Sequence, residues 1–180
     1  NISSLCLKEP LSITGDGIHS ILELLKQNPR AILQLKRLEK NWKESWNKIP
    51  EQHKHIVIEP IGNHCRGTKF VNINHLIDKD LISAFDELNG QTPGMLFVRY
   101  DLKCGSIEEL KKLDNFKILE INGVGAEPAH IYDPNNAVIQ NYKDLFQHWK
   151  TIYNIAMSQN KKGFQFMTWK EVLQMLRKYK

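Results

Sequence analysis

Two segments of this chain, residues 95–104 and 116–122, alternate polar and apolar side chains with the two-residue period of a β-strand. This alternation predicts two strands that each present polar groups on one face. The polar residues on those faces are Arg99, Asp101, Glu120 and Asn122. If the two strands pair, one guanidinium, two carboxylates and one amide converge on the same side of a sheet.

The remaining residues of the two segments are expected on fixed faces as well. In the first segment Val98, Tyr100 and Leu102 share the opposite, apolar face. In the second, Leu119 and Ile121 take the apolar face, whereas Ile118 is expected beside Glu120. Each strand is therefore expected to bury its apolar face against the rest of the fold.

The converging polar groups suit a magnesium–phosphate site. Magnesium takes hard oxygen ligands and keeps phosphate oxygens and water in its shell, and Asp101, Glu120 and Asn122 supply three oxygen-bearing side chains. Arg99 supplies a planar fork for phosphate oxygens. The alternative from spacing alone is a solvated sheet face that carries these residue types without a ligand.

Arg-Tyr-Asp-Leu at 99–102, followed by Leu-Glu-Ile-Asn-Gly at 119–123, resembles the ATP-grasp superfamily, in which an R-x-D strand precedes an E-x-N strand. D-alanine–D-alanine ligases carry this pair, and residues 14–17, Thr-Gly-Asp-Gly, resemble a segment of cyanophycin synthetases. The string at 119–133 also looks like a bacterial branch of ATP-grasp proteins. The resemblance covers roughly residues 10–135. It implies an α+β fold: an ATP-grasp C-terminal subdomain, mainly antiparallel sheet with packed helices.

The resemblance also implies a function. Asp101, Glu120 and Asn122 would bind two Mg²⁺ ions, Arg99 would be catalytic, and ATP would be the co-substrate. The expected activity is carboxylate–amine ligation through an acylphosphate. The phosphate-binding lysines and the adenine-reading hinge of such enzymes lie upstream of the matching segment, so the chain is expected to be a single domain, the C-terminal part of a longer protein. The alternative function is a catalytically incomplete binding or assembly module.

Further candidates for substrate or phosphate binding lie in two loops. His64 and Arg66 occupy a loop flanked by Gly62 and Gly67, and glycines let a backbone approach a ligand closely. The second loop follows Asn122, and its candidates are Gly123, Gly125 and His130. The resemblance implies that this loop borders the acceptor pocket. For both loops the alternative is an ordinary surface loop or a structural histidine.

The rest of the chain predicts helices and two further strands. Strands are expected at 55–59 and 68–72, and helices at 18–27 with Asp16 as N-cap, within 31–48, at 79–88 with Asp78 as N-cap, at 107–113, at 138–157 and at 168–179. The helical spacing of Trp42, Trp46, Trp149 and Trp169 predicts that all four tryptophans are core or helix-packing residues; the alternative is a platform on which bases stack.

The composition sets wide bounds on the setting of the protein. The 25 Lys and Arg residues against 20 Asp and Glu residues give a net charge of +5, which fits an anionic ligand such as a nucleotide. No basic stripe interleaved with aromatic residues indicates nucleic acid, and no run approaches the ~20 apolar residues of a membrane span. Three widely spaced cysteines favour a reducing, cytoplasmic setting. We expect no nucleic-acid or membrane partner, and the oligomeric state stays open.

Overall fold

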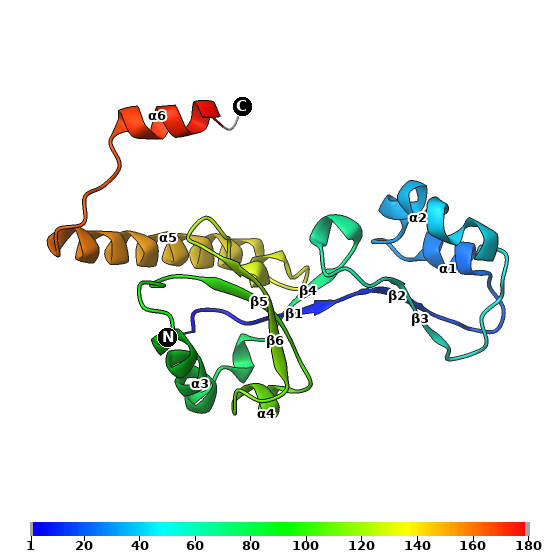
Figure 1. Cartoon of the computed structure of the whole chain (residues 1–180). Helices are drawn as coiled ribbons and strands as arrows, with labels where there is room; N and C mark the ends of the chain where they lie inside the picture. The colour runs from blue at the N-terminus through cyan, green and yellow to red at the C-terminus, as the bar shows by residue number, and fades with distance from the viewer. Residues whose placement is uncertain (1, 179–180) are drawn as a thin grey trace. The chain divides into compact units, whose positions relative to one another are not determined.

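The computed structural model describes residues 2–178, which divide by their packing into two compact units. Unit 1 comprises the chain up to Ile82 together with Ala129–Asn141, and unit 2 comprises Ser83–Pro128 together with the chain from Tyr142 onward. The fold is α+β, as predicted (Figure 1), and the strand pairs within the described residues are antiparallel. Whether the two units belong to a single domain stays a prediction.

Unit 1 contains two separate two-stranded sheets. Its strands are β1 (Cys6–Glu9), β2 (Leu11–Thr14), β3 (His55–Glu59) and β4 (Lys69–Asn72). Strand β1 pairs with β4, and β2 pairs with β3. The sequence predicts β3 with its observed bounds and β4 to within one residue, but β1 and β2 are not predicted, because each has only four residues and too few alternations to show a period.

The helices of unit 1 are short. They are α1 (Ile21–Gln27), α2 (Leu35–Trp42) and the 3₁₀ turns η1 (Ile32–Gln34), η2 (Lys43–Ser45), η3 (His64–Arg66), η4 (Asn74–Leu76) and η5 (Ala129–Tyr132). Helix α1 begins later than predicted. Its N-cap is Ser20, which forms a capping box with Glu23. Asp16, the predicted cap, instead accepts hydrogen bonds from the backbone N–H groups of Ile18 and His19.

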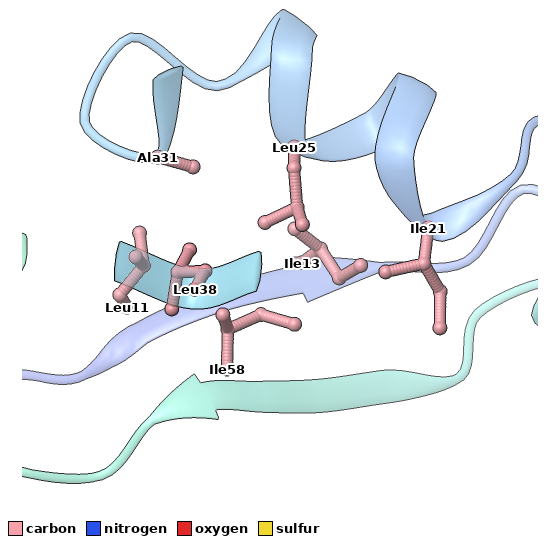
Figure 2. Close-up of a cluster of buried hydrophobic side chains, with 7 residues drawn as sticks. All are labelled: Leu11, Ile13, Ile21, Leu25, Ala31, Leu38 and Ile58. Atoms are coloured by element: carbon pink, nitrogen blue, oxygen red, sulfur yellow. The ribbon is translucent and has the colours of Figure 1, made fainter. Parts of the chain in front are cut away.

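The hydrophobic core of unit 1 lies between the β2–β3 sheet and helices α1 and α2 (Figure 2). Its buried residues are Leu11, Ile13, Ile21, Leu25, Ala31, Leu38 and Ile58. Trp42 and Trp46 pack against this cluster, as predicted, and Trp42 Nε1 donates to the Ile58 carbonyl at 3.1 Å. A buried indole N–H needs such a partner, so this bond fixes α2 to β3.

Unit 2 is built on a β-hairpin. Strands β5 (Arg99–Cys104) and β6 (Phe116–Asn122) flank the short helix α4 (Ile107–Leu110). Helices α3 (Lys79–Gly90) and α5 (Val138–Lys161) contribute residues to both units, and α6 (Trp169–Lys178) lies in unit 2. Asp78 caps α3 as predicted, by accepting from the Leu81 N–H at 2.9 Å. Of the predicted last helix, residue 179 lies outside the described residues.

Strand β5 is shorter than predicted, because residues 95–98 are not in a strand. Thr92–Gly94 form a turn that ends with Gly94 at a positive φ of 93°. Residues 95–98, which connect this turn to Arg99, have no regular secondary structure. Within the described residues, no helix has both the length and the apolar character to cross a membrane.

Candidate functional site

The β5–β6 hairpin brings the four predicted polar residues together. Arg99 lies directly opposite Asn122, and Asp101 lies directly opposite Glu120. Directly opposite residues of an antiparallel pair project from the same face, and Arg99 and Asp101 are two positions apart on one strand. The four side chains therefore form a two-by-two block on one face of the hairpin.

The connection between the strands is fixed by local hydrogen bonds. Ser106 caps α4 by accepting from the Glu109 N–H at 3.1 Å, and the Gly105 N–H donates to the Asn115 carbonyl at 3.2 Å. A Cβ at Gly105 would come within 2.1 Å of the Glu109 carboxylate and 2.4 Å of Asn115 Nδ2, so a larger residue there would displace these two side chains. Leu113 and Asn115 have positive φ angles of 52° and 44°, which turn the chain back into β6.

Arg99 is held in place on both sides. Its Nε lies 3.4 Å from Asp101 Oδ1, and its Nη1 donates to the Glu127 carbonyl at 3.1 Å. The side chain of Asp101 is 15% exposed and that of Arg99 is 36% exposed. The guanidinium is thus oriented by a carboxylate and by the loop after β6, while part of its surface stays open to a ligand.

The amide of Asn122 adds an unsatisfied donor to this block. Its Nδ2 atom is buried and has no hydrogen-bond partner among the described residues. Buried amide groups in folded proteins normally have partners, and a phosphate oxygen or a water beside Asn122 would satisfy this donor.

The side chains of Asp101, Glu120 and Asn122 fit a magnesium ion only when a substrate supplies further oxygen ligands. Among residues 2–178 no group of three or more His, Cys, Asp or Glu side chains is placed to hold a metal ion. The block offers two carboxylates, Asp101 and Glu120, and the amide of Asn122. Mg²⁺ commonly takes one or two carboxylates and fills its octahedron with phosphate oxygens and water, so these residues fit a phosphate-bound Mg²⁺ better than a free one.

The apolar side of the hairpin differs from the prediction. Tyr100 is covered by α3: its ring lies 5.8 Å from that of Phe85, and its hydroxyl is 2.6 Å from Asn89 Oδ1. Leu119 and Ile121, however, are 57% and 47% exposed. The expectation that both strands bury one apolar face is therefore wrong for β6.

A β-bulge changes the side on which Ile118 lies. The pairing register shifts between Asp101 and Leu102, so that Leu102 faces Ile118 and Leu119 is the extra residue of β6. Ile118 therefore sits opposite a residue of the apolar face, and its predicted place beside Glu120 is wrong. The alternation of polar and apolar residues in the sequence does not predict this bulge, because the extra residue, Leu119, is an ordinary strand residue.

The loop after β6 is open around its glycines. The Ala126 N–H donates to the Gly123 carbonyl at 3.0 Å, and a Cβ at Gly123 or Gly125 would meet no atom within 4 Å. Packing in the described residues therefore does not require glycine at either position.

The other predicted candidates, His64, Arg66 and His130, belong to unit 1. His64 is exposed and packs its ring 5.1 Å from that of Tyr132 and 5.6 Å from that of Phe70. His130 is buried in η5, where its carbonyl accepts from Asn136 Nδ2 at 2.8 Å. Arg66 lies 3.7 Å from the carboxylate of Glu59, which absorbs part of its charge.

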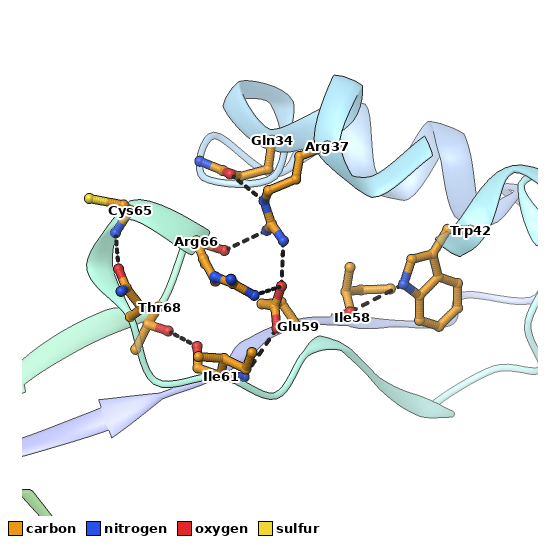
Figure 3. A network of polar contacts seen from close by, with 10 residues as sticks. Gln34, Arg37, Trp42, Ile58, Glu59, Ile61, Cys65, Arg66 and Thr68 are labelled. Carbon is orange, nitrogen blue, oxygen red and sulfur yellow. Dashed lines mark hydrogen bonds and ion pairs between the residues drawn. The ribbon is translucent and has the colours of Figure 1, made fainter. Parts of the chain in front are cut away.

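Glu59 is a buried carboxylate that sequence reasoning misses. It ends β3, is 7% exposed, and pairs with both Arg37 of α2 and Arg66 (Figure 3). Burial acts to raise the pKa of Glu59, but the hydrogen bonds from Arg37 and the Ile61 N–H, with the charges of both arginines, outweigh it and hold the pKa below its ordinary value. The sequence around Glu59, a strand end followed by Pro60, does not predict that the carboxylate pairs with Arg37 and Arg66.

The same network shapes the loop between β3 and β4. Arg37 Nη2 donates to the Arg66 carbonyl at 3.2 Å, and Arg30 Nη1 donates to the Gly67 carbonyl at 2.9 Å. Thr68 Oγ1 donates to the Ile61 carbonyl at 2.9 Å (Figure 3). The loop backbone is thus held by side chains from outside it.

Asp133 is a second buried carboxylate that the prediction did not single out. It accepts from the Asn72 N–H at 2.7 Å and from the Asn135 N–H at 2.8 Å. Burial acts to raise the pKa of Asp133, but these backbone hydrogen bonds prevail and lower it. The residue ties the η5 segment to β4, so its role in the described contacts is structural.

No protein-family model matches the chain, and no curated protein matches it. Solved structures do match. One is a bifunctional glutathione synthetase from Pasteurella multocida, to which this chain is 15% identical with a TM-score of 0.50; the match covers 81% of this chain and 23% of that one. The chain thus spans about a quarter of that ligase, and the likeness concerns the fold alone. With the geometry above, it shows that this chain shares an α+β fold with the matched part of that protein.

Proposed function

We propose that the chain is the catalytic subdomain of an ATP- and magnesium-dependent carboxylate–amine ligase. The observation that carries the proposal is the register of the hairpin, which places Arg99 opposite Asn122 and Asp101 opposite Glu120 on one face. The likeness in fold to the Pasteurella glutathione synthetase supports it, since a synthetase of that kind is a ligase. The narrower statements, on magnesium and the acylphosphate, rest on the residues of the block.

In this proposal the block binds the phosphate end of ATP. Asp101, Glu120 and Asn122 would hold up to two Mg²⁺ ions, which neutralise charge on the phosphate oxygens when bound. Arg99, oriented by Asp101 and the Glu127 carbonyl, donates to an oxygen of the γ-phosphate. The fixed guanidinium stabilises the charge on the transferring group without reorganising during the reaction.

The chemistry joins two substrates in sequence. An oxygen of the carboxylate substrate attacks the γ-phosphorus of ATP, ADP leaves, and an acylphosphate forms. An amine then attacks the acyl carbon, phosphate leaves, and an amide bond is made while the amine loses a proton. Most of the rate enhancement comes from positioning and electrostatics, so no nucleophile from the chain is needed.

The remaining candidates take part in this proposal as binding residues. The open backbone at Gly123 and Gly125 leaves room for a substrate beside Asn122. In unit 1, His64, Arg66 and His130 stay proposed substrate or phosphate contacts, although Glu59 already neutralises part of the Arg66 charge.

A second candidate function is a binding or assembly module derived from such a ligase. The exposure of Leu119 and Ile121 on a two-stranded sheet favours it, because a hairpin with an uncovered apolar face is typical of a partner-binding surface. In that case the polar block would contribute no turnover.

Magnesium-dependent phosphate release separates the two functions. We would measure it in the longest available protein that contains this chain, with Asp101→Asn and Glu120→Gln as test variants and Glu87→Gln, an exposed carboxylate of α3, as the matched control. The ligase function predicts that both test variants lose at least about a hundredfold in rate while the control keeps it. Unchanged rates in both test variants would show that these carboxylates do not bind the metal.

A further inference from the structure

Helix α6 is sharply amphipathic. With 100° between successive residues, its aliphatic and aromatic side chains fall on one arc and its polar side chains on the other. The apolar arc holds Trp169, Val172, Leu173, Met175 and Leu176. The polar arc holds Lys170, Glu171, Gln174, Arg177 and Lys178. Such a separation predicts a helix that buries one face.

In the described residues this apolar arc is not buried. None of the helix residues is buried, and Trp169 and Leu176 are 78% and 56% exposed. The residues leading into the helix continue the pattern, since Phe164, Phe166 and Met167 are each more than half exposed. An apolar surface of this size on a folded protein is typical of a binding site.

The charge around this arc is predominantly positive. Residues 161–178 contain five basic side chains and one acidic side chain. The basic residues are Lys161, Lys162, Lys170, Arg177 and Lys178. The one carboxylate, Glu171, is engaged at the helix end: it accepts from the Thr168 N–H at 2.6 Å and from the Thr168 hydroxyl at 2.8 Å. Glu171 N–H in turn donates to that hydroxyl at 3.4 Å, so the capping box sets where the helix begins.

We propose that residues 161–178 bind an anionic lipid surface, with α6 lying in the plane of the membrane interface. Its apolar arc would enter the boundary between headgroups and acyl chains, and its basic residues would face the lipid phosphates. Ten residues, about 15 Å of helix, are too few to span a bilayer but enough to lie on one. The sequence alone predicts no membrane partner, because the exposure of the apolar arc is visible only in the folded chain.

A lipid surface fits these features better than a protein groove or nucleic acid. Basic residues lie at both ends of the segment 161–178, with Lys161 and Lys162 at one end and Arg177 and Lys178 at the other, which matches a uniformly negative surface. Trp169 stands at the start of the helix, and tryptophan favours the membrane–water interface because its ring is apolar and its N–H is polar. Nucleic acid would be bound by the cations but would leave the apolar arc in water.

Vesicle binding by the whole chain tests the proposal. We would sediment it with phosphatidylcholine vesicles that either contain about one third phosphatidylserine or contain none. We expect binding to the anionic vesicles that is at least about tenfold tighter than to the neutral ones. Neutralising two basic residues with Lys170→Gln and Lys178→Gln should weaken anionic binding by about thirtyfold. Leu173→Gln, which removes an apolar contact but no charge, should weaken it as well.

Two controls make the result specific to α6. Lys36→Gln with Lys40→Gln removes the same charge from the exposed side of α2 and should leave vesicle binding unchanged. Lipids brominated in their acyl chains should quench tryptophan fluorescence in the parent, and most of that quenching should vanish in Trp169→Phe. Equal weakening by the α2 and α6 pairs, absence of vesicle binding, or Leu173→Gln changing only self-association in sedimentation velocity would each overturn the proposal.

Discussion

Asp101 of β5 lies directly across the hairpin from Glu120 of β6, so two carboxylates share one face of a two-stranded sheet. Like charges directly opposite one another destabilise an antiparallel pair. Arg99 lies close to Asp101 and relieves part of this repulsion. The arrangement has a cost in stability, and a bound cation would remove that cost.

The first prediction separates this cost from function. Glu120→Gln should raise the free energy of unfolding in metal-free buffer by about 0.2–1 kcal/mol, because it removes one of two facing charges. Magnesium with ATP should stabilise the parent chain more than the variant. Thermal unfolding with and without magnesium and ATP is the measurement. Glu87→Gln, the exposed α3 control, should change neither value.

A second prediction concerns nucleotide binding by the chain as it stands. We expect residues 1–180 to fold and to bind magnesium–ATP weakly, because the block contacts only phosphate and offers no apolar pocket for adenine. Isothermal titration calorimetry with magnesium–ATP and with magnesium–triphosphate is the test. Similar affinities are expected; a strong preference for ATP would mean that the chain contains an adenine site of its own.

The ion pair of the buried Glu59 with Arg37 predicts a pH dependence of stability. The pKa of Glu59 is below its ordinary value in the folded chain, so its stabilisation is complete above the ordinary glutamate pKa of about 4.3 and is lost as the pH falls through the folded pKa. Arg37→Ala should cost about 1–3 kcal/mol at neutral pH, since it leaves a buried carboxylate with fewer partners. Urea unfolding at pH 7 and pH 3 should show that this cost shrinks in acid. In Glu44→Gln, an exposed control on η2, neither the stability nor its pH profile should move.

The pair of Asp16 and His19 predicts the opposite direction. His19 Nδ1 lies 2.6 Å from Asp16 Oδ2, and this hydrogen bond raises the pKa of His19 above its ordinary value. Any stabilisation from the pair is therefore complete below the ordinary histidine pKa of about 6.5 and is lost as the pH rises through the folded pKa. An NMR titration should show His19 titrating at higher pH than an ordinary histidine, and Asp16→Asn should return it toward the ordinary value.

Gly15 and Gly90 predict opposite responses to alanine. A Cβ at Gly15 would lie 2.2 Å from the Glu51 carbonyl oxygen and 2.8 Å from Pro50 Cβ, so Gly15→Ala should destabilise unit 1 by at least about 2 kcal/mol. At Gly90, in the last turn of α3, a Cβ meets nothing within 4 Å. Gly90→Ala should be neutral or stabilising by up to about 1 kcal/mol. Equal effects in chemical denaturation would show that the contact at Gly15 relaxes.

Local pattern predicted much of the fold. The bounds of β3 and β6 and the cap of α3 were predictable because each depends on alternation or on one capping side chain. Strands β1 and β2 were not, since their partners lie more than 40 residues away and four residues show too little periodicity. The tryptophans divide in the same way: Trp42 and Trp46 pack as predicted, whereas Trp149 and Trp169 are 50% and 78% exposed, so the prediction is wrong for them.

The candidate site shows a similar division. The shared face of Arg99, Asp101, Glu120 and Asn122 follows from strand parity, which the sequence displays. The tether from Arg99 to the Glu127 carbonyl and the pairing of Glu59 with two arginines depend on tertiary packing between segments distant in sequence. The local sequence does not predict these contacts, because many charged residues of suitable length could make them.

The bulge at Leu119 divides the hairpin into two parts that protein engineering can change separately. Between the bulge and the end of β6, three consecutive residue pairs run in regular register, and they include all four polar side chains. On the other side of the bulge the arm leading to α4 follows a different register. A designer can therefore lengthen, shorten or replace that arm and its connection without changing which side chains share the polar face. Conversely, a graft of the polar block into another scaffold needs Arg99–Asp101, Glu120–Asn122 and the following loop as far as Glu127, whose carbonyl orients Arg99. The bulge marks where the transplanted strands can be cut.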